Sequence, residues 1–315
     1  MNPEELRRLH PVLSIGIATP YNVDQASGVN DNVFTTAEEF RRRGHKVRVI
    51  GYSGNHTEIE DFIDTDGIRL KLPISGSVIN VALRTPRWDD IIKRELMHDG
   101  RFDAFILHEL GPFAFPQHFV TRMNHNRTAN IGVTHASGLS WWNPVHNAYL
   151  DLVGTKKSIR RNLHRMFAVS HVAEALTKYY VPGDYEILPN PVDTTLYNPD
   201  KRRRLFDDDR MNVLFVGRHG RTEKRKGFRY LARAFKIILD EARYSDRIRL
   251  IVGGPGELDR ESREVLSTLP SDSYIVLGPK PIPEKELIEL YASADILVSP
   301  ATGHESFGLV VAKSM

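Results

Sequence analysis

Short apolar runs rich in β-branched residues alternate with longer helical segments along most of this chain. The runs at 12–19, 102–108 and 211–217 are typical of strands buried on both faces of a sheet. The connection from one strand through a helix to the next parallel strand is right-handed. Repeated units of this kind therefore build parallel sheets covered by helices. The alternation therefore predicts an α/β protein. Further strands are expected at 46–52, 129–134, 166–170, 248–253, 274–277 and 295–299, a hairpin at 64–72, and helices ending near 43, beginning at 227, and at 257–269 and 283–293.

A charged stretch at 189–210, with three prolines and few apolar residues, interrupts this pattern. The alternation starts again directly after it. At 315 residues the chain is also long for a single domain. We therefore expect two Rossmann-like domains, at 1–195 and 211–315, joined by a linker at 196–210.

The second of these domains is expected to be incomplete. Its sequence contains four expected strands, whereas an average sheet has about 5–6. The chain stops at Met315, just inside an expected helix, so one sheet edge should be poorly covered. A shortened chain is the simplest interpretation.

Composition excludes several classes of protein. There are no cysteines, which rules out disulfides, thiolate nucleophiles and cysteine–zinc sites. No apolar run approaches the roughly 20 residues of a membrane span, and the N-terminus has no signal-peptide pattern, so we expect a cytoplasmic protein. The net charge of +3 is too small to indicate a nucleic-acid partner.

The residues that follow the expected strands are the best candidates for a functional site. In open parallel sheets, ligands bind beyond the carboxyl ends of the strands. In the first half these positions are Gly28, His108–Glu109 and His135. In the second half they are the segments at 218–226, 253–256 and 300–305.

Two of these segments carry charged side chains suited to binding a ligand. Arg218 and Lys226 lie at the two ends of a loop that opens onto a helix N-terminus. Two cations and the helix dipole together make a good diphosphate site. Glu305 lies at the start of another expected helix. Gly308 in the first turn allows a ligand to approach the backbone closely.

The order of these motifs resembles that of a known family. VGRHGRTEKRKG, VGGPGE and ADILVSP…ESFGLVVA follow one another in the second half, and FILHE, GVTHASG and LPNPVD in the first. Together they resemble family four of the glycosyltransferases, the group 1 transferases, and are similar to the phosphatidylinositol mannosyltransferases. The resemblance implies a retaining enzyme of the GT-B fold, in which two Rossmann-like parallel-sheet domains face a cleft. It covers nearly the whole chain.

The resemblance also implies roles for individual residues. Gly28 would place backbone amides against the donor diphosphate, and Arg218 and Lys226 would neutralise that group in place of a metal ion. His135 would lie beside the transferred sugar, and Glu305 would hold the sugar hydroxyls. The donor would also be bound by residues of the glycine-rich loop near the nucleobase and of the last helix, namely Gly254, Glu257, Ser306, Phe307, Gly308 and Lys313.

Lys313 departs from the pattern of the family. That family normally has a second glutamate eight positions after the first, which accepts hydrogen bonds from the ribose hydroxyls. A lysine ammonium only donates, so weaker nucleotide binding is expected, with a phosphate contact as the alternative. A catalytically impaired sugar-nucleotide-binding or scaffold protein is therefore the second hypothesis. A GT-B-fold epimerase is a third, which the ESFG segment and the RKG loop disfavour.

The expected partners are a UDP- or GDP-sugar, which is a co-substrate and not a cofactor, and a glycan or lipid hydroxyl acceptor. The segments 64–66 and 207–209 match an Asp-x-Asp metal motif, but we interpret them as turn and linker chemistry, so no metal is expected. The basic cluster Arg41–Arg42–Arg43 suggests peripheral contact with an anionic membrane. Neither the base, the sugar nor the acceptor can be chosen from the sequence.

Overall fold

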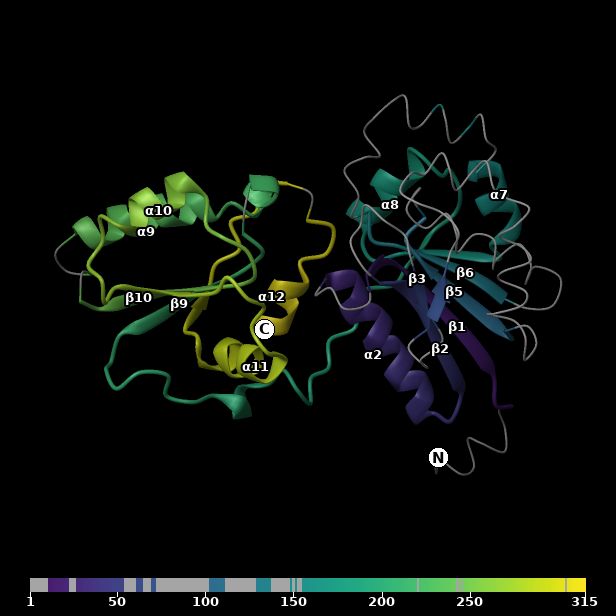
Figure 1. The fold of residues 1–315 in the computed structure, drawn as a ribbon, viewed down its shortest axis with the longest axis horizontal. Helices are drawn as coiled ribbons and strands as arrows, with labels where there is room; N and C mark the ends of the chain where they lie inside the picture. Colours follow the sequence, from purple (N-terminus) through teal and green to yellow (C-terminus); the bar gives the residue numbers. More distant parts are fainter. Residues whose placement is uncertain are drawn as a thin grey trace. The chain divides into compact units, whose positions relative to one another are not determined.

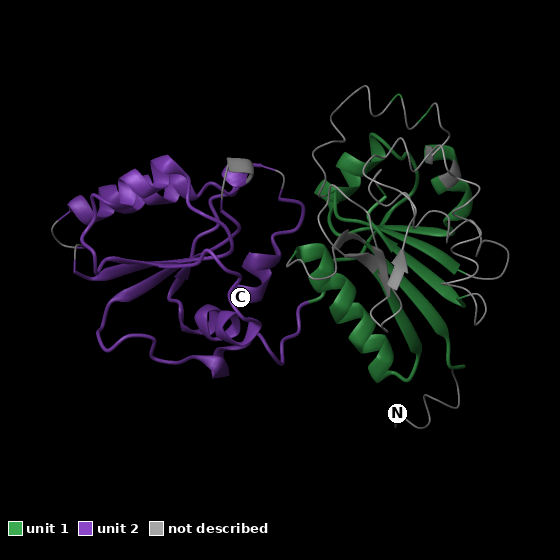
Figure 2. Cartoon of the chain, viewed as in Figure 1, with its two compact units in different colours: residues 1–191 green, residues 192–315 purple. Residues whose placement is uncertain are grey.

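A computed structural model describes the fold of two compact units, residues 1–191 and 192–315 (Figure 2). The described residues are 11–22, 27–53, 61–64, 69–71, 102–110, 129–136, 148, 151, 155–219, 221–241, 244, 246–303 and 305–315. Each unit consists of a largely or wholly parallel sheet with helices packed on it, as the alternation of strands and helices predicts.

The sheet of the first unit has eight strands in the order β4-β3-β2-β1-β5-β6-β7-β8. Six of them are parallel, and β3 and β4 form an antiparallel hairpin at the β2 edge. The hairpin begins at residue 61, three residues before the expected position. The parallel strands are β1 (Ser14–Asn22), β2 (Lys46–Ser53), β5 (Ala104–His108), β6 (Ala129–Thr134), β7 (Arg165–Ala168) and β8 (Glu186–Ile187), and the hairpin strands are β3 (Asp61–Asp64) and β4 (Arg69–Lys71).

Helix α2 (Gly28–Arg42) packs on β1 and β2 of this sheet (Figure 1). The Ser27 hydroxyl caps the helix by accepting from the Asn30 amide at 3.1 Å. Val29, Val33 and Ala37 are buried on one stripe, with the spacing that an amphipathic helix requires. The other helices of the unit are α7 (Thr155–Asn162) and α8 (His171–Lys178).

The second unit has a four-stranded sheet in the order β11-β10-β9-β12, and every pairing is parallel. Side chains alternate between its two faces. Phe215 of β9 packs in a core with α9 (Phe228–Asp240) and α10 (Arg260–Leu266). Leu214 packs in a core with α11 (Glu284–Ser293), so helices cover both faces (Figure 1). The strands are β9 (Met211–Val216), β10 (Ile248–Gly253), β11 (Tyr274–Leu277) and β12 (Ile296–Leu297).

The helices of the second unit begin close to the carboxyl ends of its strands. Helix α10 is shorter than expected, because Asp259 caps it by accepting from the Ser262 amide at 2.9 Å and residues 257–259 stay outside it. The helices are α9 (Phe228–Asp240), α10 (Arg260–Leu266), α11 (Glu284–Ser293) and α12 (Leu309–Ser314), with 3-10 turns η4 (Pro199–Lys201) and η5 (Arg221–Lys226).

The charged segment 196–210 belongs to the second unit and packs against the rest of it. Arg202 pairs with Asp295 at 2.9 Å, and the amide of Arg203 donates to the Ser293 hydroxyl at 2.8 Å. Asp208 pairs with Arg249 of β10. Side chains of this segment therefore stabilise the second unit, a role that its composition alone does not indicate.

Candidate functional site

The loop after β9 holds three charged side chains in one cluster. Glu223 is the centre of this cluster: its Oε1 lies 3.7 Å from Nε of Arg218, and its Oε2 lies 3.3 Å from a guanidinium nitrogen of Arg225. The Glu223 side chain is only 16% exposed, whereas that of Arg218 is 38% exposed. Glu223 thus attracts the Arg218 guanidinium, part of which stays open to a ligand.

Lys226, at the end of η5, forms an ion pair with Glu305 in the loop before α12. Nζ of Lys226 lies 2.6 Å from Oε2 of Glu305. The same two loops are joined by the amide of Thr302, which donates to the Arg225 carbonyl at 2.9 Å. The fold thus brings together two residues that the sequence singled out in separate motifs.

The glycine-rich loop after β10 is attached to the Arg218 loop through the backbone. The amide of Gly217 donates to the Gly253 carbonyl and the amide of His219 to the Pro255 carbonyl, both at 2.9 Å. Gly254 is buried and Glu257 is exposed. These bonds give the loop a structural role, and the expected contact of Gly254 and Glu257 with a nucleobase stays a prediction.

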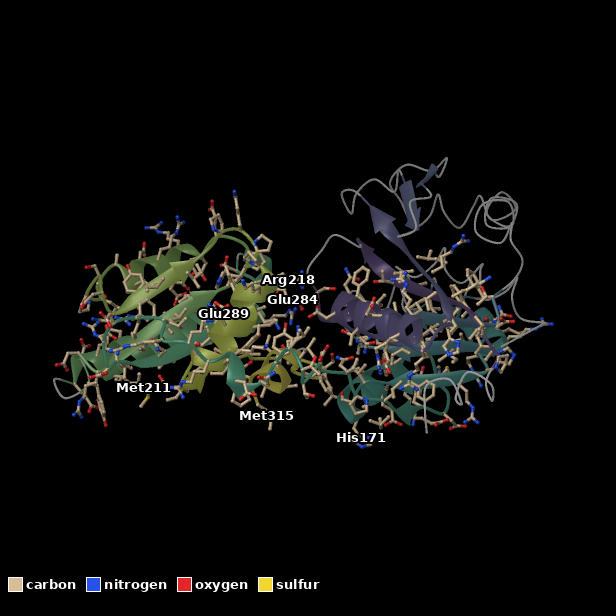
Figure 3. All side chains as sticks on the ribbon, turned by 90° about the horizontal axis from the view of Figure 1, so that it is seen from below. His171, Met211, Arg218, Glu284, Glu289 and Met315 are labelled. Atoms are coloured by element: carbon tan, nitrogen blue, oxygen red, sulfur yellow. The ribbon has the colours of Figure 1, made fainter. Side chains whose placement is uncertain are left out.

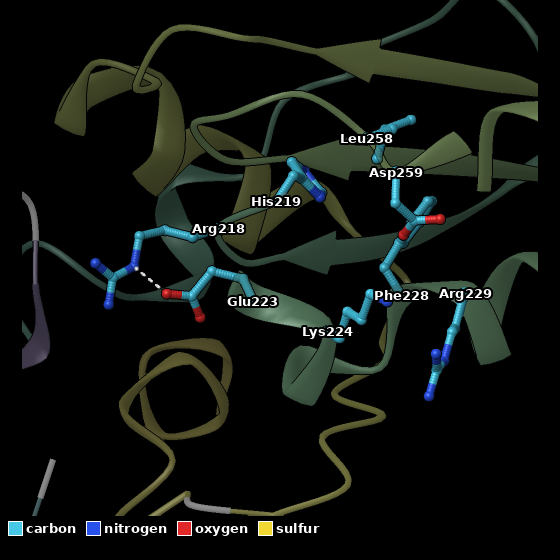
Figure 4. A pocket seen from close by; sticks show the side chains of 8 residues that line it. All are labelled: Arg218, His219, Glu223, Lys224, Phe228, Arg229, Leu258 and Asp259. Atoms are coloured by element: carbon cyan, nitrogen blue, oxygen red, sulfur yellow. Dashed lines mark ion pairs between the residues drawn. The ribbon is translucent and has the colours of Figure 1, made fainter. Parts of the chain in front are cut away.

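A small pocket is lined in part by Arg218 and Glu223 of the charged cluster (Figure 4). His219 lines it and is half-buried, and this burial lowers the pKa of its imidazole, with an opposing effect from Asp259. Nε2 of His219 has no hydrogen-bond partner among the described residues. His219 and Glu223 both lie inside the VGRHGRTEKRKG motif, but no spacing or charge pattern in the sequence distinguishes either of them. The lining residues are Arg218, His219, Glu223, Lys224, Phe228, Arg229, Leu258 and Asp259.

The segment between Glu305 and α12 contains the remaining expected donor-binding residues. Ser306, Phe307 and Gly308 are half-buried, and Gly308 has a φ of 81°. No described atom lies within 4 Å of the position that a Cβ on Gly308 would take, so there is open space beside this backbone. Nζ of Lys313 lies 4.7 Å from the ring centroid of Tyr197, in a cation–π contact.

In the first unit, His108, Glu109 and His135 meet at the carboxyl ends of β5 and β6. Nδ1 of His108 lies 3.0 Å from Nε2 of His135, and Oε1 of Glu109 accepts from the His135 amide at 3.0 Å. All three residues are less than 5% exposed. Gly28, in contrast, is exposed at the first position of α2. His108 and Glu109 occupy a strand end, and that position was the signal from which their partnership with His135 could be suspected.

Burial keeps both histidines of this cluster neutral. It lowers the pKa of His108 to about 3. The pKa of His135 is lowered well below its usual value by burial and, to a smaller extent, by repulsion from His108. The imidazoles therefore act as hydrogen-bonding groups, and not as charges, near neutral pH.

We expect acid to destabilise the first unit through this pair. Between pH 6.5 and about 3 the unfolded chain binds a proton at His108 and the folded chain does not. The free energy of unfolding therefore has its full value above pH 6.5 and decreases as the pH falls below it. Two pH units below 6.5 correspond to about 3 kcal/mol for His108 alone. Urea unfolding of wild type and His108→Asn at pH 7.5 and 4.5 measures this, and the variant should lose less stability on acidification.

His171 supplies the matched control for that measurement. Its side chain is 87% exposed and points away from the rest of the unit (Figure 3). Its ring contacts Glu174, whose pKa is lowered mainly by Lys178, so His171→Asn should change the pH dependence of stability much less than His108→Asn does. An equal pH dependence in wild type and His108→Asn would contradict the expected role of His108.

The charged residues considered for membrane contact and for metal binding have partners within the chain. Arg42 and Arg43 both pair with Glu39, at 2.8 and 2.7 Å, and their hydrogen bonds lower the pKa of Glu39 to about 2. Arg41 donates to the Val47 carbonyl at 3.1 Å. Asp208, in one of the two Asp-x-Asp segments, is engaged by Arg249, and the side chains of the other segment lie outside the described residues. Within the described part of the chain, no helix is long and apolar enough to cross a membrane.

The fold defines the structural class of this protein. The structure resembles that of the sucrose-phosphate synthase of Thermosynechococcus elongatus with a TM-score of 0.67 at 18% sequence identity, over 95% of this chain and 78% of that one. Two parallel-sheet units, of which the second has the smaller sheet, correspond to the GT-B fold.

The sequence then identifies the family. Residues 26–196 match the model of Glycosyltransferase Family 4, and residues 210–315 match that of the group 1 glycosyl transferases. The chain belongs to glycosyltransferase family 4. It is 28% identical over 304 residues to the phosphatidyl-myo-inositol mannosyltransferase of Mycobacterium tuberculosis. The aligned region covers 96% of this chain and 75% of that protein. Identity to the protein of the same name from Mycolicibacterium smegmatis is 25% over 311 residues, covering 96% and 74%.

Proposed function

We propose that this protein transfers a hexose from a UDP- or GDP-sugar to a hydroxyl acceptor, with retention of the anomeric configuration and without a metal ion. Membership of glycosyltransferase family 4 supports sugar transfer from a nucleotide-sugar. The observation that carries the finer proposal is the meeting of Lys226 and Glu305, at 2.6 Å, beside the N-terminus of α9. A cation for the diphosphate and a carboxylate for the sugar hydroxyls then lie next to each other.

The positive groups at this site supply the electrostatic part of catalysis. The departing nucleoside diphosphate develops negative charge in the transition state, and fixed cations directed at it lower the barrier. Arg218, oriented by Glu223, and Lys226 take this role, and the N-terminus of the 13-residue helix α9 adds its dipole. The leaving diphosphate in turn accepts a hydrogen bond from the incoming acceptor hydroxyl.

On donor binding, Lys226 exchanges Glu305 for the donor diphosphate as its partner. Before the donor binds, the Lys226 ammonium is paired with the Glu305 carboxylate. The donor diphosphate then competes for the ammonium, and Glu305 becomes available to accept from two sugar hydroxyls. The ion pair therefore holds both side chains near their working positions, which reduces the entropy lost on binding.

A lipid headgroup is the acceptor that the relatives favour, because their names specify phosphatidyl-myo-inositol as the molecule that is mannosylated. We propose a lipid hydroxyl as the acceptor and a hexose, with mannose as the first candidate, as the transferred sugar. We also propose peripheral contact with an anionic membrane through the basic cluster of α2. Co-sedimentation with liposomes that survives neutralisation of Arg41, Arg42 and Arg43 would exclude the arginine cluster as its basis.

We expect one nucleotide, UDP or GDP, to raise the thermal stability of the protein, in the presence of EDTA as well as in its absence. A ligand that binds only the folded state stabilises it by about 2.7 kcal/mol at 100 times its dissociation constant. Differential scanning fluorimetry with UDP, GDP and their sugar conjugates measures this. Arg218→Ala should reduce the shift, whereas Arg233→Ala, on the exposed face of α9, should keep it.

The absence of a shift with any of these nucleotides would contradict the donor site. A shift that requires Mn²⁺ or Mg²⁺ would contradict the metal-independent proposal instead.

A catalytically impaired binding protein is the second candidate, and Lys313 is the observation that favours it. Its ammonium lies over the Tyr197 ring, so a donor-only group occupies α12 where a second acceptor is expected. Nucleotide binding without sugar transfer or donor hydrolysis, both in wild type and in Lys313→Glu, would establish this candidate. Turnover by the wild-type protein would eliminate it.

A further inference from the structure

We propose that His108 is a positioning residue that fixes the ring tautomer of His135, so that His135 offers a neutral Nδ1–H donor to an oxygen of the transferred sugar. The hydrogen bond between the two rings stands independently of the proposed function. The ligand on His135 rests on that function, because it assumes a bound nucleotide-sugar.

The hydrogen bond between the rings limits where their protons can lie. It joins Nδ1 of His108 to Nε2 of His135 at 3.0 Å, with the ring planes only 28° apart and the centroids separated by 5.3 Å. A neutral imidazole has one nitrogen that donates and one that accepts. One of the two bonded nitrogens therefore carries the proton, and the other presents its lone pair.

The remaining nitrogen of His108 decides between these two arrangements. Nε2 of His108 is buried and has no hydrogen-bond partner among the described residues. Buried N–H groups without an acceptor are rarer in folded proteins than buried acceptors with an unused lone pair. Nε2 of His108 accordingly carries the lone pair, and Nδ1 carries the proton and donates to His135.

The tautomer of His135 follows from that of His108. Its Nε2 accepts, so its proton lies on Nδ1, the only ring nitrogen left for another group. The burial that lowers the pKa of both rings keeps this arrangement neutral. A neutral N–H donor suits a hydroxyl or ring oxygen of a sugar, and it cannot serve as a general base.

Hydrogen bonds also fix the backbone around His135. Glu109 accepts from the His135 amide at 3.0 Å, while its own amide donates to the Val133 carbonyl at 2.7 Å. Glu109 and Ala136 have φ values of 69° and 49°, and they are the non-glycine residues with positive φ within the described part of the chain. Strained backbone of this kind persists where surrounding contacts enforce it, and it concentrates at functional sites.

The ring tautomers are measured directly by long-range ¹H–¹⁵N correlation NMR on the full chain labelled with ¹⁵N-histidine. The chain has 13 histidines, so the signals are assigned from the ones that disappear in His108→Asn and in His135→Gln. We expect His135 and His108 to be Nδ1–H tautomers at pH 7.5. An Nε2–H tautomer or a doubly protonated ring at His135 would overturn the proposal. This measurement needs no activity.

Kinetics with two variants of His108 test the same point in function. Asparagine can place an amide donor near the former Nδ1, and leucine cannot. We expect His108→Leu to lower kcat by about 10-fold or more with little change in KM for the donor, as for other residues that orient a functional group, and His108→Asn to retain most of kcat. His171→Asn controls for loss of a histidine as such.

Equal losses of kcat in both His108 variants, or no loss in either, would count against a role through the tautomer. If leucine prevents folding, the asparagine variant and the tautomer of its His135 still decide the question. If wild type transfers and hydrolyses no sugar, the proposed function fails, while the NMR result for His135 still confirms or refutes the inference.

Discussion

Lys226→Ala should lower the rate of sugar transfer, or of donor hydrolysis, by about 10²–10³-fold. Removing one group that stabilises developing charge in a buried site typically has an effect of this size. Lys226 is 20% exposed and lies 2.6 Å from Glu305, so the variant loses the cation and also leaves the Glu305 carboxylate without that partner. Steady-state kinetics with the nucleotide-sugar identified by thermal shift give the result.

Lys236 is the matched control for this variant. It also pairs with an acidic residue in the same unit, Asp240 at 3.6 Å, but both side chains are 40% exposed or more. Lys236→Ala should therefore change the rate by less than about 2-fold, since exposed pairs contribute little. A rate for Lys226→Ala within a few-fold of wild type would remove Lys226 from the proposed mechanism.

The double variant Lys226→Ala/Glu305→Ala separates structure from catalysis. If the ion pair served only stability, the double variant would be no less active than either single variant. Because we assign the two side chains to different parts of the donor, we expect it to be less active than both. Coupling between the two sites in stability should stay near 1 kcal/mol or below, as for other partly exposed pairs.

Gly227→Ala should destabilise the second unit by roughly 3 kcal/mol or more. Gly227 caps α9 with a φ of 75°, in the left-handed region, which costs a residue with a side chain about 1–2 kcal/mol. A Cβ there would also overlap the Pro300 carbonyl oxygen. Relieving that overlap requires the loop that carries Glu305 to move, and such overpacking typically costs a further 1–3 kcal/mol. Chemical denaturation measures the loss.

Gly308→Ala is the matched control, because Gly308 has nearly the same backbone conformation, with a φ of 81°, and no described atom within 4 Å of its would-be Cβ. It should lose only the conformational part, about 1–2 kcal/mol. It should instead weaken nucleotide binding, since the methyl group occupies space that we assign to the donor. Equal destabilisation by the two changes would mean that the Pro300 contact is unimportant.

The class of fold was predictable from local patterns. β1, β9 and β10 are short apolar runs, and α9 buries one stripe at helical spacing, so composition and periodicity identify them without tertiary information. The ends of helices were less predictable, because they depend on which side chain accepts a hydrogen bond from the first free amides of the helix. The Asp259 side chain starts α10, and the Ser170 hydroxyl starts α8 by accepting from the Ala173 amide at 3.1 Å.

The candidate site was predictable as a set of positions and not as a set of contacts. Arg218, Lys226, Glu305 and His135 were expected because they follow strands. Glu223 was not, because an acidic residue in a basic loop has no distinctive spacing, and only its contacts with Arg218 and Arg225 give it a role. The strand-end positions of His108 and His135 were also expected, but the contact between their two rings was not.

By itself, the sequence determined the α/β class, the two parallel sheets, the loops that carry the candidate residues and the resemblance to the glycosyltransferases. These features depend on local periodicity and on motif order, which a single chain displays directly. Only the tertiary structure joined Lys226 to Glu305, 79 positions away, and His108 to His135, 27 positions away. The pairing of β5 with β6, and of β9 with both β10 and β12, brings these strand ends together. Strand order is set by the packing of the whole unit, so no local pattern encodes it.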